Sequence, residues 1–88
     1  GPFRGWFKGA YGLGVSKEAQ RLFVTDWGNN RVQVFDRGGD FLTTFGTGGE
    51  GPGEMDQPTD VAVEKDGTVY VMDFGNDRVQ VWRPAEAK

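Results

Sequence analysis

The chain has 88 residues with neither cysteine nor histidine, and its formal net charge is −3. A chain of this length forms one small domain, whose core is marginal unless a disulfide, a metal or oligomerisation supports it. The absence of cysteine and histidine excludes disulfides and thiolate metal sites and removes the commonest general base. We therefore expect no cofactor and no metal. We also expect no membrane span, because no apolar run is long enough to cross a bilayer. Oligomerisation is the remaining support, and the compartment stays undetermined.

The sequence of the first half of the chain predicts short strands, and the segment in the middle of this half recurs later in the chain. Leu22–Phe35 aligns with Val69–Trp82 at an offset of 47 residues, and eight of the 14 aligned positions are identical. Upstream of this stretch the offset becomes 48, so that Leu13 meets Val61. Self-similarity at such a period is typical of repeat architectures. The chain therefore divides into a first repeat, 1–48, and a second, incomplete repeat, 49–88.

A glycine-rich segment separates the two repeats. Phe41–Phe45 predicts the fourth strand of the first repeat, and Gly46–Glu54 follows it. A phosphate-binding loop would need a following helix and usually a lysine, and this segment has neither. We expect a plain long loop here.

The second repeat predicts three strands, at Asp60–Glu64, Thr68–Met72 and Arg78–Trp82. Asp66-Gly67 lies between the first two and favours a type I′ hairpin turn, which needs positive φ at both central residues. The chain ends soon after the third strand, and Pro84 cannot donate to a further ladder. We expect the second repeat to lack its own outer strand.

The N-terminal segment Phe3–Phe7 has two interpretations. By analogy with Phe41–Phe45 it supplies the missing outer strand and closes a ring as a clasp. By the offset of 48 residues it is a loop that matches Gly51–Met55. The sequence leaves both open.

The central strands of the two repeats are apolar on both faces, as Leu22–Val24 and Val69–Val71 show. An antiparallel sheet with one wet face alternates cleanly between apolar and polar residues. Four-stranded meanders of about 45 residues that are covered on both faces are propeller blades. The expected fold class is all-β: a β-propeller with two four-stranded antiparallel blades per chain.

Three segments resemble the NHL repeat of β-propellers: Gly51–Met55, Pro58–Glu64 and Thr68–Val81. The first repeat carries the same pattern, with Ala10 in place of the proline. The resemblance implies a ring that often has six blades. It also implies a partner that is usually a protein and sometimes RNA, with a few enzymes among the relatives.

Two blades leave two apolar faces open, and stacked repeats generally need about three units. Identical chains that join head to tail close a ring when the rotation fits. Three copies would give six blades and four would give eight, both within the usual range. The resemblance favours the trimer, and the tetramer stays open.

A motif of the form Asp-x-Gly-Asn-x-Arg follows the second strand of each repeat. Its occurrence at one spacing in both repeats indicates a structural role, in which Asp accepts turn amides and Arg pairs with a carboxylate. The motif residues are Asp26, Asn29, Arg31, Asp73, Asn76 and Arg78.

The end of the blades that carries this motif is the candidate partner-binding end. Exposed aromatic side chains there would anchor a protein, and the spacing of the acidic residues does not match a calcium loop. The whole net charge of −3 falls on this end, which disfavours nucleic acid. The candidate residues are Trp6, Tyr11, Trp27, Glu50, Glu54, Asp56, Asp60 and Phe74.

These features predict a non-enzymatic scaffold that assembles into a ring and binds protein. The first alternative is a piece of a larger natural propeller that senses a protein or a ligand. An RNA-binding protein and a metal-dependent propeller lyase or hydrolase are less favoured. An engineered model of propeller evolution by duplication also fits the repeat.

Overall fold

The computed structural model describes residues 7–83, and its regular structure consists of β-strands and two short 3-10 turns. No helix in this part of the chain is long and apolar enough to cross a membrane. In chain order the elements are β1 (Ala10–Ser16), β2 (Arg21–Asp26), η1 (Trp27–Asn29), β3 (Arg31–Asp36), β4 (Phe41–Phe45), β5 (Thr47–Gly48), β6 (Glu54–Met55), β7 (Pro58–Val63), β8 (Val69–Asp73), η2 (Phe74–Asn76) and β9 (Arg78–Trp82).

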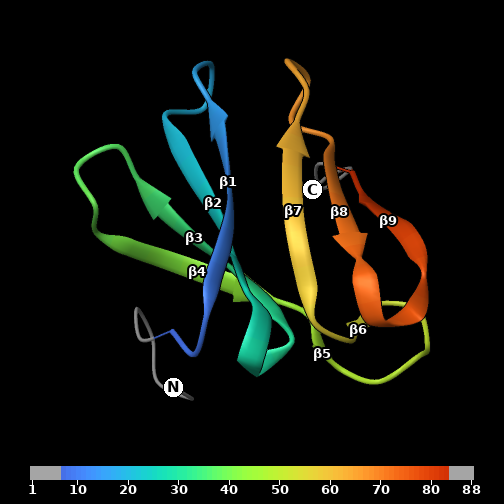
Figure 1. The fold of residues 1–88 in the computed structure, drawn as a ribbon. Coiled ribbons are helices and arrows are strands. Elements are labelled where there is room, and N and C mark those ends of the chain that lie inside the picture. Colours follow the sequence, from blue (N-terminus) through green and yellow to red (C-terminus); the bar gives the residue numbers. More distant parts are fainter. Residues whose placement is uncertain (1–6, 84–88) are drawn as a thin grey trace.

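The first four strands form one antiparallel sheet in the order β1-β2-β3-β4 (Figure 1). At the turn between β3 and β4, the Asp36 carboxylate accepts the amides of Gly38 and Asp40, each at 2.9 Å. Gly39 completes this turn with a φ of 95°, which glycine adopts without steric cost. The predicted four-stranded meander of the first repeat is confirmed.

The second sheet has the order β7-β8-β9 and is also antiparallel. Its first turn differs from the prediction. A type I′ turn needs a positive φ at both Asp66 and Gly67, but only Gly67 has one, of 93°. The Glu64 amide donates to the Thr68 carbonyl, which leaves three residues in the loop. The type I′ prediction is therefore wrong, and Gly67 takes the left-handed position of a three-residue hairpin loop.

Two predictions concern the ends of the chain. Residues 84–88, where an outer strand of the second repeat would continue, lie outside the described part of the chain. Of Phe3–Phe7, only Phe7 is described, and its ring centroid lies 5.8 Å from that of Phe35. The choice between a strand and a loop for this segment stays a prediction.

The connection between the two sheets is more ordered than the predicted plain loop. β5 and β6 pair in parallel, and the Gly49 amide donates to the Met55 carbonyl at 3.2 Å. Gly49 and Gly53 have φ values of 142° and 78°, which turn the backbone so that the two ends of the segment meet. Residues 49–53 form a loop as predicted, and the pairing of Thr47–Gly48 with Glu54–Met55 closes its two ends.

The two sheets meet along β1 and β7, which lie side by side (Figure 1). A Cβ atom at Gly12 would lie 2.7 Å from the Cα of Asp60, and one at Gly14 would lie 3.0 Å from the Val61 carbonyl oxygen. Side chains at these two positions would push the strands apart. The two glycines therefore permit the close approach of the sheets.

The apolar core lies between the two sheets. Phe45 of the first sheet and Trp82 of the second are tilted against each other, with ring centroids 4.7 Å apart. Core formation by packing one small sheet on the next is the arrangement of propeller blades. The buried core residues are Val32, Met55, Val61, Val69 and Val71.

Candidate functional site

Each blade holds one fully buried aspartate at the end of its second strand, Asp26 in β2 and Asp73 in β8. Oδ1 of Asp26 accepts the Lys8 amide at 2.8 Å, and Oδ1 of Asp73 accepts the Asp56 amide at 2.7 Å. Each amide belongs to the segment that leads into the same sheet. The backbone amide that each carboxylate accepts therefore comes from this segment, and the expectation of a turn amide is corrected.

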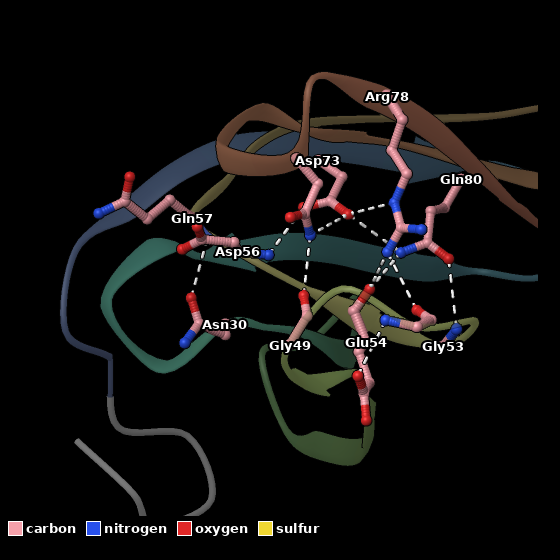
Figure 2. Close-up of polar contacts among 11 residues, drawn as sticks. Asn30, Gly49, Gly53, Glu54, Asp56, Gln57, Asp73, Arg78 and Gln80 are labelled. Atoms are coloured by element: carbon pink, nitrogen blue, oxygen red, sulfur yellow. Dashed lines mark hydrogen bonds and ion pairs between the residues drawn. The ribbon is translucent and has the colours of Figure 1, made fainter.

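The second oxygen of each carboxylate collects side-chain donors. Around Asp73 these are Nε of Arg78 at 2.7 Å, Asn76 at 3.1 Å and Gln80 at 3.2 Å (Figure 2). The same arrangement recurs around Asp26, with donors Arg31 at 2.8 Å, Asn29 at 3.0 Å and Gln33 at 3.3 Å.

In the second blade these donors also hold the connection between the sheets. Nη2 of Arg78 donates to the carbonyls of Gly51 and Glu54, at 3.0 and 2.7 Å, and Figure 2 shows this side chain directed at Glu54. Asn76 donates to the Gly49 carbonyl at 2.8 Å. The glycine-rich connection is thus fixed to the turn that follows β8.

Both buried carboxylates are ionised at neutral pH. Burial alone would raise the pKa of Asp26, because it penalises the charged form. The hydrogen bonds from the Lys8 amide, Asn29 and Arg31 outweigh burial, and the pKa of Asp26 is lowered. The same balance lowers the pKa of Asp73. Since their oxygens are engaged by donors of the fold itself, this geometry favours an architectural role.

The aromatic candidates lie at the end of the blades that carries η1 and η2, which we call the turn end, without forming one cluster. The rings of Tyr11 and Trp27 have centroids 6.0 Å apart, and Tyr11 is 67% exposed. Phe74, the equivalent of Trp27, begins η2 and is 62% exposed. Trp6 lies outside the described residues.

The acidic candidates do not converge on one point. Glu50 and Asp60 are exposed, whereas the Glu54 carboxylate turns back to accept the Gly51 amide at 2.9 Å. Asp56 is half-buried, and its backbone bonds to the second blade. Within residues 7–83 no three carboxylates are placed to hold a metal ion.

The second sheet has an open apolar face, which we call the tail face. The register pairs Ala62 with Tyr70, Tyr70 with Val81, and Met72 with Val79, so these side chains share one side of the sheet. Val79 is 54% exposed. A shallow, mainly apolar pocket lies on this face, lined by Asp60, Val61, Ala62, Tyr70, Met72 and Val79.

The first sheet has an open apolar face on its opposite side, which we call the head face. The register pairs Leu13 with Val24 and Val15 with Leu22, so these four side chains lie on the same side of the sheet. Leu13 is 61% exposed. A monomer in water would therefore expose apolar surface on both of its outer sheet faces.

The two sheets pack against each other within the chain along β1 and β7, a contact that we call the interior interface. The head and tail faces repeat its two sides. The interior side of the first sheet pairs Gly14 with Phe23 and Thr25 with Val32, in the register that pairs Ala62 with Tyr70 and Met72 with Val79 on the tail face. The interior side of the second sheet pairs Val61 with Val71 and Val63 with Val69, in the register of the head face. The sequence predicted that two apolar faces stay open without assigning residues to them, although the repeat offsets of 47 and 48 residues already carry this correspondence.

Comparison with known proteins agrees with this geometry. Residues 13–82 match a family described as a 6-bladed β-propeller. The chain is 34% identical over 82 residues to the E3 ubiquitin-protein ligase NHLRC1 of Rattus norvegicus and 32% identical to that of Homo sapiens, alignments that cover 91% of this chain and 21% of each relative. The E3 ubiquitin-protein ligase TRIM71 of Rattus norvegicus is 42% identical over 43 residues, which are 49% of this chain and 5% of that protein.

The chain thus spans about a fifth of the length of its NHLRC1 relatives. The family match covers both sheets, and the resemblance to the NHL repeat is confirmed by these relatives. This chain belongs to the six-bladed β-propeller family, as an NHL-type segment of two blades.

Proposed function

We propose that this chain is a two-blade unit whose copies join head to tail into a closed propeller, and that the ring serves as a non-catalytic scaffold for binding proteins. A trimer with six blades is favoured over a tetramer with eight. The observation that carries the proposal is the correspondence of the two open faces to the two sides of the interior interface. A head face of one copy is expected to cover the tail face of the next.

The chemistry of the faces supports this assembly. Leu13 on the head face and Val79 on the tail face are more than half exposed, and their burial in an interface is favourable at about 25 cal/mol per Å² of apolar surface. A head-to-tail contact between identical chains is heterologous, and it closes into a ring when the rotation fits. The match to a six-bladed family supports three copies.

Native mass spectrometry at micromolar chain concentration tests the ring. The expected particle contains three chains of 9.7 kDa, about 29 kDa in total. A monomer at every concentration would overturn the proposal.

Two charge insertions test the head-to-tail polarity. Leu13→Lys removes the head face and leaves a tail face, whereas Val79→Lys does the reverse. Each variant alone is expected to be a monomer, and an equimolar mixture is expected to form a dimer through the one intact pair of faces. Self-association of either variant alone would show that like faces pair, and would contradict the polarity.

The protein-binding surface that we propose is the turn end of the ring, with Tyr11, Trp27 and Phe74 as apolar contacts. Phe74 and Tyr11 are exposed, and aromatic side chains of this kind are typical anchors of protein interfaces. The acidic residues around them favour a partner with basic side chains and disfavour nucleic acid. Selection of random peptides on the immobilised protein should enrich peptides with basic residues, whose binding Phe74→Ala weakens. Equal enrichment on the variant would contradict this surface.

A second candidate is a two-blade part of a larger propeller within one longer chain. The share of the relatives that this chain spans, about a fifth, favours it. In that case the head and tail faces are covered by other blades of the same chain. A stable monomer of the 88-residue chain that binds neighbouring blades added as a separate polypeptide would favour this candidate over the ring.

A further inference from the structure

The interior interface contains a polar contact at the turn end of the blades. Asn30 follows η1 in the left-handed region, with a φ of 54°. Its Oδ1 accepts the backbone amide of Gln57 at 2.8 Å (Figure 2). This bond joins the turn of the first blade to the segment that leads into β7 of the second blade, so it crosses from one blade to the next.

Both partners of this bond have equivalents on the open faces. Asp77 stands 47 residues after Asn30, follows η2, and has nearly the same φ of 53°. Gly9 stands 48 residues before Gln57, and both residues have a positive φ, of 104° and 56°. Asp77 comes two residues before Val79 of the tail face, and Gly9 comes four residues before Leu13 of the head face, so by the repeat they take the places of Asn30 and Gln57 on the open faces.

Asp77 is available for such a contact. The residue is exposed, and within residues 7–83 its carboxylate makes no hydrogen bond and no ion pair. Its own amide donates to the Phe74 carbonyl at 3.1 Å, which fixes the backbone of the turn. The turn that holds Asp77 therefore has nearly the same backbone geometry as the turn that holds Asn30.

The neighbouring charges also fit. Inside the chain the acceptor is the neutral amide of Asn30, and the residue before Gln57 is Asp56, which would repel a carboxylate. At the head end the residue before Gly9 is Lys8, an exposed cation. The negative charge of Asp77 therefore suits a position beside the cation Lys8, whereas the neutral side chain of Asn30 suits a position beside the anion Asp56.

Resting on the proposed ring, we infer that the Asp77 carboxylate of one chain accepts the Gly9 amide of the next, with Lys8 of that chain beside it. This contact, which we call the inter-chain latch, reproduces between copies the bond that Asn30 and Gln57 make within a chain. A hydrogen bond to an ionised acceptor is stronger than one between neutral groups. The latch therefore adds affinity and sets the register of the head face on the tail face.

Asp77→Ala tests the latch through the concentration at which the assembly dissociates, measured by analytical ultracentrifugation. Loss of a hydrogen bond to a charged group should weaken association about 10- to 100-fold per interface. Asp77→Asn should retain most of the affinity, because it copies Asn30, and should weaken the dependence on salt. Asp40→Ala removes the same charge from the exposed turn at the other end of the blade and should leave association unchanged.

Hydrogen exchange of the Gly9 amide gives a second readout. In the assembled wild-type protein this amide should be protected, and Asp77→Ala should abolish its protection. The Gln57 amide, bonded within the chain, should stay protected in both proteins. Wild-type rings with an unprotected Gly9 amide and an unaffected Asp77→Ala variant would overturn the latch and leave the ring standing. A wild-type chain that is monomeric at every concentration would overturn the ring, and the latch with it.

Discussion

The substitution Asp73→Ala removes the acceptor at the centre of the network in the second blade. The carboxylate is fully buried and accepts four hydrogen bonds, from the Asp56 amide, Asn76, Arg78 and Gln80. Removing one partner of a buried ion pair costs about 3–5 kcal/mol.

The structure decides which end of that range applies. The side chain of Arg78 is 31% exposed and keeps its bonds to two backbone carbonyls, so we expect a loss near the lower end, about 3 kcal/mol. The Arg31 side chain is only 11% exposed, so Asp26→Ala should cost more than Asp73→Ala. Since a domain of this size is stable by about 4–13 kcal/mol, either loss is a large fraction of the total.

Urea denaturation at one fixed chain concentration measures these losses, because assembly couples stability to concentration. Asp73→Asn keeps the shape of the side chain and should cost less than Asp73→Ala. Asp40→Ala, at an exposed turn, should leave the unfolding midpoint unchanged. A free energy of unfolding for Asp73→Ala within about 0.5 kcal/mol of wild type, the range of ordinary surface substitutions, would refute the architectural role of the network.

Three further outcomes follow from the fold. Gly12→Ala should lower the melting temperature because its Cβ would press on the neighbouring strand, whereas Gly38→Ala, whose Cβ would meet only a side-chain oxygen, should not; equal melting temperatures would contradict the close approach of the sheets. Met55→Ala should cost about 2–5 kcal/mol in denaturant unfolding, because this fully buried side chain leaves a cavity, and a loss under 1 kcal/mol would argue against this core. The lowered pKa values of Asp26 and Asp73 mean that their ionisation stabilises the fold above about pH 4, the unfolded value, and that this contribution is lost as the pH falls through the folded values. Thermal melts from pH 7 to pH 2 should show that loss, and a melting temperature that does not fall on acidification would contradict it.

The repeat in the sequence was enough to predict the class of fold. Identical residues at an offset of 47 specify that two segments take the same local structure, and apolar residues on both faces of a short strand specify a sheet covered on both sides. The meander of the first repeat and the strand at Arg78–Trp82 could therefore be predicted from the sequence alone. The Asp-Gly pair marked the hairpin correctly, but the turn type was missed because Asp66 keeps a negative φ when a third residue enters the loop.

Contacts between segments that are distant in the chain were decided only by the tertiary structure. Asp26 finds its backbone donor at Lys8, 18 residues upstream, because strand pairing folds the leading segment back over the turn. The need for glycine at position 12 is invisible in the repeat, since the equivalent residue is Asp60. It arises only when β1 approaches β7. By itself the sequence determined the blades and their number, because local patterns suffice for short strands and turns. The tertiary structure decided which faces stay open and how they correspond, because that depends on the register and the packing of whole sheets.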